Sequence, residues 1–261
     1  MPMNWRGIGW HWNALGRTNP FGAIITCGGS PKAEWDTDEF FATGRADAAR
    51  FVADLARLQP AHRCRTALDF GCGVGRITRP LADHFEAVVG IDIAGSMIGR
   101  ARGLNRDSPR CRFVLNRAPD LRMFASGTFD VAYSRLVLQH MPPETIKQYV
   151  PELIRVLAPG GVLMFQLPTE IPFVDAERLY VEAPILGPAW KRQLPKALVH
   201  VHRLVKYRLF VAPIPRMDMF GLPRDAVLEL IRHAGGVALA VVPDQSHGAG
   251  VPGFEYWVLK P

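Results

Sequence analysis

The amino-acid sequence predicts an α/β fold in which a mostly parallel sheet is covered by helices on both faces. Short, continuously apolar segments alternate with amphipathic segments of helical period. Strands that are buried on both faces of a parallel sheet have this continuously apolar character. The first such segment also runs directly into a glycine-rich turn and then into a helix. The 261 residues, 48% of them hydrophobic, suffice to bury a full core.

The expected strands and helices alternate along the chain. Apolar runs predict strands at 66–70, 87–91, 112–115, 129–133, 162–167, 237–242 and 255–259. Helical spacing of apolar residues predicts helices at 46–58, 77–85, from about 95, at 143–157 and at 223–234. A proline opens the last of these helices and Gly235 follows its end, as is typical of helix termini. Residues 158–161, Ala-Pro-Gly-Gly, are expected to stop the helix before them.

Charge and cysteine content limit the function classes. The net charge of +7 fits either an anionic partner or a basic surface that only aids solubility. No two cysteines form a C-x-x-C pair and no Cys/His cluster has zinc spacing, so no metal site is expected. No apolar stretch has the length of a membrane span, and no export leader is apparent. These observations predict a cytoplasmic protein with reduced thiols.

A glycine-rich turn follows the strand expected at 66–70. The stretch from Asp69 to Gly75 reads Asp-Phe-Gly-Cys-Gly-Val-Gly. Glycine is needed where the backbone turns with positive φ or closely approaches a ligand, and the next helix offers free N–H groups. Asp92 stands at the end of the next strand, where a carboxylate can accept hydrogen bonds from both hydroxyls of a ribose. This half of the fold is therefore predicted to hold a nucleoside.

The spacing of the glycines separates two classes of nucleoside. A dinucleotide site has the pattern G-x-G-x-x-G, whereas this turn reads G-x-G-x-G and has Arg76 where the third glycine would fall. Asp69, ahead of the first glycine, would repel a pyrophosphate and suits the ammonium group of a methionine tail. Both features favour S-adenosylmethionine as the cofactor.

Four segments of the chain resemble motifs of the class I S-adenosylmethionine-dependent methyltransferases. They read LDFGCGVGRIT, VVGIDIAGSMI, FDVAYSRLVLQHMPP and ELIRVLAPGGVLMFQLP. The resemblance implies a Rossmann-like sheet of seven strands, mostly parallel with the last strand antiparallel, and helices on both faces. It also implies cofactor contacts from Asp69, Gly71, Gly73, Gly75, Asp92, Ile93, Asn116, Ala118 and Ser134. One departure is that Asn116-Arg-Ala118 replaces the Gly-Asp-Ala pattern frequent in that family, so Asn116 is either an adenine contact or a turn residue.

The changes in pattern along the chain, together with the extent of the resemblance, divide it into four segments. Residues 1–45 are expected to form an aromatic lid of loops and short helices, and residues 46–168 the core that binds the cofactor. A helical insertion or acceptor cap is expected at 169–220, and residues 221–261 complete the core sheet. A basic amphipathic helix near 191–210 either packs on the core or contacts a membrane or a lipid-linked substrate.

Methyl transfer is an in-line displacement, so much of its rate can come from positioning, and a general base helps when the acceptor is a hydroxyl. His140 follows the fourth expected strand and is the candidate base; the alternative is a structural histidine that shapes the acceptor pocket. The family's motif for methylating amino groups of nucleic acids is missing, because Tyr133-Ser-Arg-Leu136 stands in its place.

The sequence therefore predicts O-methylation of a small molecule, such as the hydroxyl of a sugar, a lipid-linked glycan or a natural product. N- or C-methylation and a non-catalytic protein that binds S-adenosylmethionine are alternatives. No nucleic-acid partner is expected, and the sequence leaves the oligomeric state open. An RNA-methylating enzyme would need a basic strip with stacking aromatic residues beside the cleft.

Overall fold

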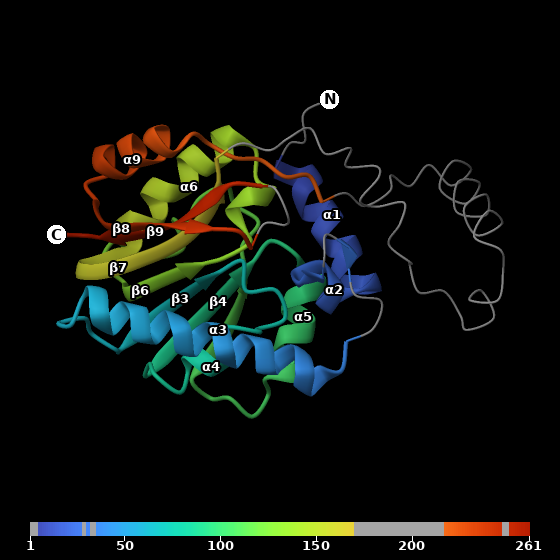
Figure 1. The fold of residues 1–261 in the computed structure, drawn as a ribbon. Coiled ribbons are helices and arrows are strands. Elements are labelled where there is room, and N and C mark those ends of the chain that lie inside the picture. Colours follow the sequence, from blue (N-terminus) through green and yellow to red (C-terminus); the bar gives the residue numbers. More distant parts are fainter. Residues whose placement is uncertain (1–4, 28–29, 32–34, 170–216, 247–250) are drawn as a thin grey trace, which may run out of the picture.

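A computed structural model describes residues 5–27, 30–31, 35–169, 217–246 and 251–261. Its main feature is a seven-stranded sheet with the order β5-β4-β3-β6-β7-β9-β8 (Figure 1). The strands are β3 (Thr66–Phe70), β4 (Ala87–Asp92), β5 (Cys111–Leu115), β6 (Phe129–Ser134), β7 (Leu157–Pro168), β8 (Val237–Asp244) and β9 (Gly253–Leu259). The last strand, β9, is antiparallel to both of its neighbours. The other neighbouring pairs, β5/β4, β4/β3, β3/β6 and β6/β7, are parallel. The predicted Rossmann-like sheet with an antiparallel last strand is confirmed.

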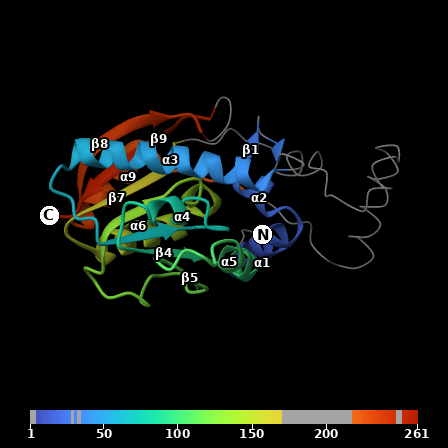
Figure 2. The ribbon, with the colours of Figure 1, turned by 90° about the horizontal axis from the view of Figure 1, so that it is seen from below.

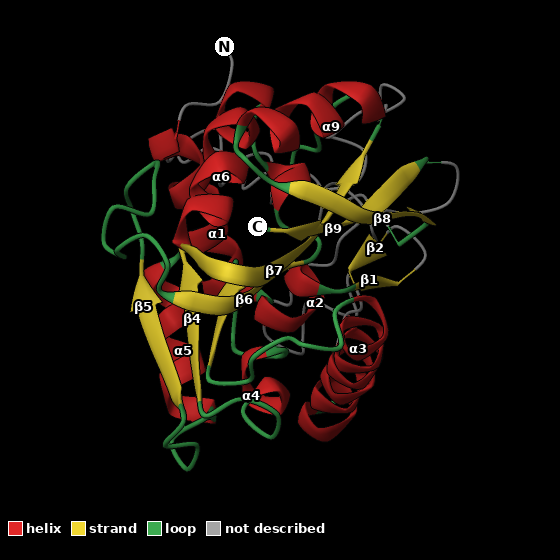
Figure 3. Ribbon diagram, turned by 90° about the vertical axis from the view of Figure 1, so that its left-hand side faces the viewer, coloured by secondary structure: helices red, strands yellow, loops and turns green. Residues whose placement is uncertain are grey.

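Helices cover both faces of this sheet, as Figure 3 shows. On one face lie α3 (Thr37–Leu58), α4 (Thr78–Leu81) and α5 (Gly95–Leu104), which pack against strand residues through two apolar clusters. On the other face α6 (Pro143–Val156) and α9 (Arg224–His233) pack through a larger cluster. Side chains of the central strands belong to clusters on both faces, which explains their continuously apolar sequence.

The N-terminal residues stand beyond the carboxyl ends of the parallel strands (Figures 1 and 2). They form α1 (Trp5–Thr18), α2 (Pro20–Ile24) and a small hairpin of β1 (Thr26–Cys27) and β2 (Ser30–Pro31). Asn13 of α1 accepts a hydrogen bond from the backbone of Ser96 at 3.0 Å, which ties α1 to the start of α5. The predicted loops and short helices are therefore replaced, in part, by a helix of 14 residues.

Three predicted boundaries differ from the structure by four residues or more. Helix α3 begins at Thr37 instead of 46, because the carboxylate of Asp36 caps it by accepting from the backbone N–H groups of the first turn at 2.9 and 3.0 Å. The helix expected at 77–85 is reduced to the four residues of α4, in which Pro80 lacks an N–H group. Strand β7 begins at Leu157, and its register with β6 shifts before Val162, so residues 158–161 bulge out of the ladder.

The expected boundary at residue 45 falls inside α3. The basic helix expected near 191–210, and most of the insertion expected at 169–220, lie outside the described residues. In the described part of the chain, no helix combines the length and apolar character needed to cross a membrane.

Candidate functional site

The glycine-rich turn lies where β3 ends. Gly71, Gly73 and Gly75 have φ values of +78°, +55° and +88°, a region that side chains other than glycine rarely adopt. The backbone N–H groups of Gly71 and Cys72 both donate to the carbonyl of Ile91 at 2.8 and 2.9 Å. The turn is therefore tied to the end of β4, the strand that carries Asp92.

Space around the first two glycines is filled by side chains from distant parts of the chain. A Cβ atom on Gly71 would collide with both γ carbons of Val137, and one on Gly73 would lie 2.6 Å from the Cδ1 atom of Ile24. Gly75 faces the packing between α5 and β5 instead, since its Cβ would lie 2.8 Å from the ring of Phe113. Gly71 and Gly73 therefore allow Val137 and Ile24 to approach the turn closely beside the cavity described below. Gly75 allows close packing in the core.

Asp92 ends β4 and faces this turn. Its Oδ2 accepts from the N–H of Gly73 at 3.0 Å, and its Oδ1 accepts from the N–H of Ala94 at 2.8 Å. Burial raises the pKa of Asp92 to about 6, although these backbone hydrogen bonds oppose the shift. A carboxylate oxygen has further acceptor capacity, so Asp92 can receive additional donors in this arrangement.

A cavity lies beside the glycine turn and Asp92. It encloses about 780 Å³ of space, including its opening to solvent. Six of the predicted site residues line it: Gly71, Gly73, Asp92, Ile93, Asn116 and His140. Asp69, Gly75, Ala118 and Ser134 are not among its lining residues.

Asp69 lies behind the turn. Its Oδ2 accepts from the hydroxyl of Thr78 at 2.6 Å, and only 3% of the residue is exposed. Burial raises the pKa of Asp69 to about 6. The structure thus shows a contact that braces the start of α4, and the expected contact with a methionine ammonium group stays a prediction. Ser134 is also buried, and its hydroxyl has no hydrogen-bond partner among the described residues.

Asn116 follows β5 and opens a loop that reaches to β6. Its Oδ1 accepts from the N–H of Ala118 at 3.0 Å, and its Nδ2 donates to the carbonyl of Asp120 at 2.9 Å. These bonds form a turn, which is one of the two roles predicted for Asn116. Asn116 also lies in the cavity wall, and its contact with adenine stays a prediction.

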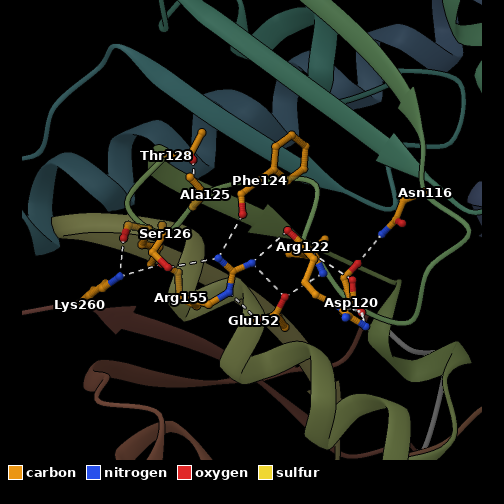
Figure 4. A network of polar contacts seen from close by, with 12 residues as sticks. Asn116, Asp120, Arg122, Phe124, Ala125, Ser126, Thr128, Glu152, Arg155 and Lys260 are labelled. Atoms are coloured by element: carbon orange, nitrogen blue, oxygen red, sulfur yellow. Dashed lines mark hydrogen bonds and ion pairs between the residues drawn. The ribbon is translucent and has the colours of Figure 1, made fainter.

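Arg155 of α6 holds the rest of this loop (Figure 4). Its guanidinium donates to the carbonyls of Leu121 and Phe124 at 3.0 and 3.1 Å and forms an ion pair with Glu152. Glu152 in turn accepts from the N–H of Leu121 at 2.8 Å. The loop that presents Asn116 is therefore fixed to a core helix by charged hydrogen bonds.

His140 lies at the end of a single 3-10 turn, Leu138–His140, after β6. Only 7% of it is exposed, and its ring contacts Trp12 edge to face with centroids 5.0 Å apart. Its Nδ1 lies 3.0 Å from the carbonyl of Asp218, so Nδ1 carries a proton and donates. Its Nε2 lies 3.1 Å from the side-chain nitrogen of Gln139 and accepts there.

Sequence reasoning missed several residues of the cavity wall. The N-terminal segment contributes Ile8, Trp12, Ala23 and Ile24. Arg76 and Arg135 also line the cavity, as do Leu136, Val137, Met141 and Tyr149. Leu136 has a φ of +60°, unusual for a residue with a side chain, and its N–H donates to Gln166 at 2.9 Å. No local pattern marks these residues, except that Trp12 belongs to the aromatic N-terminal segment.

The residues present fit S-adenosylmethionine. Asp92 offers carboxylate oxygens for a ribose, Gly71 and Gly73 place backbone without side chains in the cavity wall, and Ile93 and Tyr149 provide apolar surface for a base. Among the described residues, no three His, Cys, Asp or Glu side chains gather as metal ligands do.

Comparisons with known proteins point to methyltransferases. Residues 67–161 match the family described as Methyltransferase domain. The chain is 33% identical over 168 residues to a trans-aconitate 2-methyltransferase from Azoarcus sp. strain BH72, covering 62% of this chain and 60% of that protein. It is 34% identical over 125 residues to a 2-methyl-6-phytyl-1,4-hydroquinone methyltransferase from Synechocystis sp. strain PCC 6803, covering 48% and 38%. The matches therefore span less than two thirds of these relatives.

The fold resembles that of the magnesium protoporphyrin IX methyltransferase of Synechocystis PCC 6803, solved with bound S-adenosylhomocysteine. The TM-score is 0.61 at 15% identity, with 99% of this chain and 100% of that chain covered. The domain matched at 67–161, the methyltransferase relatives and the shared fold together support a class I S-adenosylmethionine-dependent methyltransferase.

Proposed function

We propose that the protein transfers the methyl group of S-adenosylmethionine to an oxygen of a small molecule, such as the hydroxyl of a sugar, a lipid-linked glycan or a natural product. The observation that carries the proposal is a cavity in whose wall Gly71 and Asp92, the residues expected to bind the cofactor, lie together with His140 and Trp12. A cofactor and an acceptor held in one such space can be aligned for in-line displacement.

The named relatives support a small acceptor. One carries the name of trans-aconitate and the other that of a phytyl hydroquinone, so both are named for small molecules. The cavity is consistent with such an acceptor, because most of its lining residues are apolar and a few polar groups converge among them.

The chain's own residues have separate tasks in this proposal. Asp92 and the glycine turn bind the nucleoside, which when bound supplies an electrophilic methyl group on a sulfonium. Trp12 and Ile24 close the cavity from the N-terminal side and limit the access of water. The Nδ1–H of His140 donates to Asp218, so Nε2 is the atom that can take a hydroxyl proton, in place of its contact with Gln139.

Two measurements test the proposal. Isothermal titration of the purified protein with S-adenosylmethionine should give binding in the micromolar range, and NADH should not bind. Transfer of tritium from S-[methyl-³H]adenosylmethionine should then be measured with a panel of sugars, glycolipids, phenols and amines, and with RNA. Labelling of hydroxyl compounds supports O-methylation. Labelling only of amines or RNA contradicts it, and cofactor binding without any labelling favours the non-catalytic alternative.

A further inference from the structure

Two arginines form part of the cavity wall and have no assigned task. Arg76 follows the glycine turn directly, and Arg135 follows β6. Their side chains are only 7% and 14% exposed. Both line the same cavity as Gly71, Gly73 and Leu136. Buried guanidinium groups are rare unless they are paired, so their partners decide what they do.

One carboxylate of α3 bridges the two arginines. The Nη1 of Arg76 donates to the Oδ2 of Asp47 at 2.8 Å, and the Nη1 of Arg135 donates to the Oδ1 at 2.7 Å. Asp47 thereby holds both guanidinium groups in place from the helix that covers the sheet. Two arginines that share one carboxylate are fixed in position but only partly satisfied.

Arg135 has more donors than acceptors around it. A guanidinium carries five N–H donors, and the described residues offer Arg135 one acceptor within hydrogen-bond distance, on Asp47. Its contacts with the carboxylates of Asp244 and Glu255 measure 3.9 and 4.0 Å, too long for hydrogen bonds. The Nε atoms of Arg135 and Arg76 are buried without a hydrogen-bond partner in the described part of the chain. Buried donors of this kind indicate that an acceptor is missing.

The charges around the two arginines balance, so net charge gives no reason to expect an anion to bind here. The unused N–H donors of the arginines do give such a reason. Arg50, Arg76 and Arg135 are matched by Asp47, Asp244 and Glu255, with Arg50 bound to both oxygens of Glu255. A neutral cluster attracts a dianion such as phosphate weakly. The planar fork of an arginine matches the two oxygens of a carboxylate and adds charge-assisted hydrogen bonds.

We propose that Arg135, assisted by Arg76, is a carboxylate-recognition subsite of the cavity. The inference rests on the proposed function, since it places the subsite beside the bound cofactor. The carboxylate has two sources in this chemistry: the methionine tail of S-adenosylmethionine or an acid group of the acceptor. Asp69, the acid expected to meet that tail, lies behind the turn, whereas both arginines lie on its cavity side.

Isothermal titration of the full chain distinguishes the two sources. S-adenosylmethionine and its decarboxylated analogue are titrated into the wild type, Arg135→Gln and Arg135→Lys. In a second arm, tricarballylate and its uncharged triamide are titrated with and without S-adenosylhomocysteine. Arg112→Gln is the matched control, because Arg112 is an exposed arginine on β5. Melting temperatures report folding, and Arg135→Lys, which keeps the charge but not the fork, serves if Arg135→Gln fails to fold.

If the cofactor tail binds here, the wild type prefers S-adenosylmethionine over the decarboxylated analogue by about tenfold or more, and Arg135→Gln abolishes the preference. If the acceptor's acid binds here, that preference survives in Arg135→Gln, but the preference for tricarballylate over the triamide is lost. The subsite is overturned if Arg135→Gln changes neither preference. Failure of the wild type to bind S-adenosylmethionine contradicts the proposed function instead, and the tricarballylate arm without cofactor still decides the subsite.

Discussion

Replacing Gly71 by alanine tests the geometry of the cofactor turn. Its φ of +78° costs an alanine about 1–2 kcal/mol. The added Cβ would also lie 2.9 Å from the Cβ of Val137 and closer still to both γ carbons, and overpacking of this kind costs about 1–3 kcal/mol. We therefore expect Gly71→Ala to lower the free energy of unfolding by about 2–5 kcal/mol. Affinity for S-adenosylmethionine should fall as well, because relief of the collision moves the turn.

A matched control isolates the collision from the backbone strain. Gly235 has the same φ of +78°, and a Cβ added there meets no atom within 4 Å. Gly235→Ala should therefore cost only the backbone term, about 1–2 kcal/mol. Urea unfolding of both variants gives the difference, and Gly71→Ala combined with Val137→Ala should recover part of it, because the two γ carbons are removed while the Cβ at position 137, 2.9 Å away, remains. Equal destabilisation by Gly71→Ala and Gly235→Ala would refute the proposed contact with Val137.

Three further predictions concern the site. Because burial raises the pKa of Asp92 to about 6 and the ionised carboxylate is the better acceptor, cofactor affinity should be full above pH 7 and fall about tenfold per pH unit below 6. Titration calorimetry of Asp92→Asn should show weaker binding without that slope, and a retained slope would assign it to another group. His140→Ala should lower the rate of methyl transfer by about 10²–10⁴ with cofactor affinity unchanged; normal turnover would exclude His140 as the base. Arg155→Met should destabilise the protein by about 1–3 kcal/mol and weaken cofactor binding, whereas Lys147→Met, which breaks an exposed pair on the same helix, should cost under about 0.5 kcal/mol. Equal effects of these two substitutions in urea unfolding would contradict the role of Arg155.

Much of the sheet could be predicted because each strand has its own apolar signal. Strand β3 ends where the glycines begin, and β9 falls within two residues of its expected start. Boundaries that depend on capping or packing were less accurate. The start of α3 depends on the Asp36 cap, and Gly44 lies inside this helix at a position where a Cβ atom would collide with the Arg76 carbonyl.

The candidate site divides in the same way. Gly71, Gly73 and Asp92 were predicted from spacing, because turn geometry and strand ends are local properties. Spacing did not indicate the partner that Asp69 has in the structure, the hydroxyl of Thr78, and its contact with a methionine ammonium group stays a prediction. The choice between cavity and core at that position depends on side-chain direction, which spacing does not determine.

The sequence by itself determined the class of cofactor and the order of the elements, because glycine spacing and apolar periodicity act over a few residues. Only the tertiary structure decided which residues enclose the cavity. Trp12 meets His140 across 128 positions, and Asp47 meets Arg135 across 88. Such contacts form when separate elements pack on the carboxyl edge of one sheet. Their closeness is a property of that packing and leaves no periodic trace in the chain.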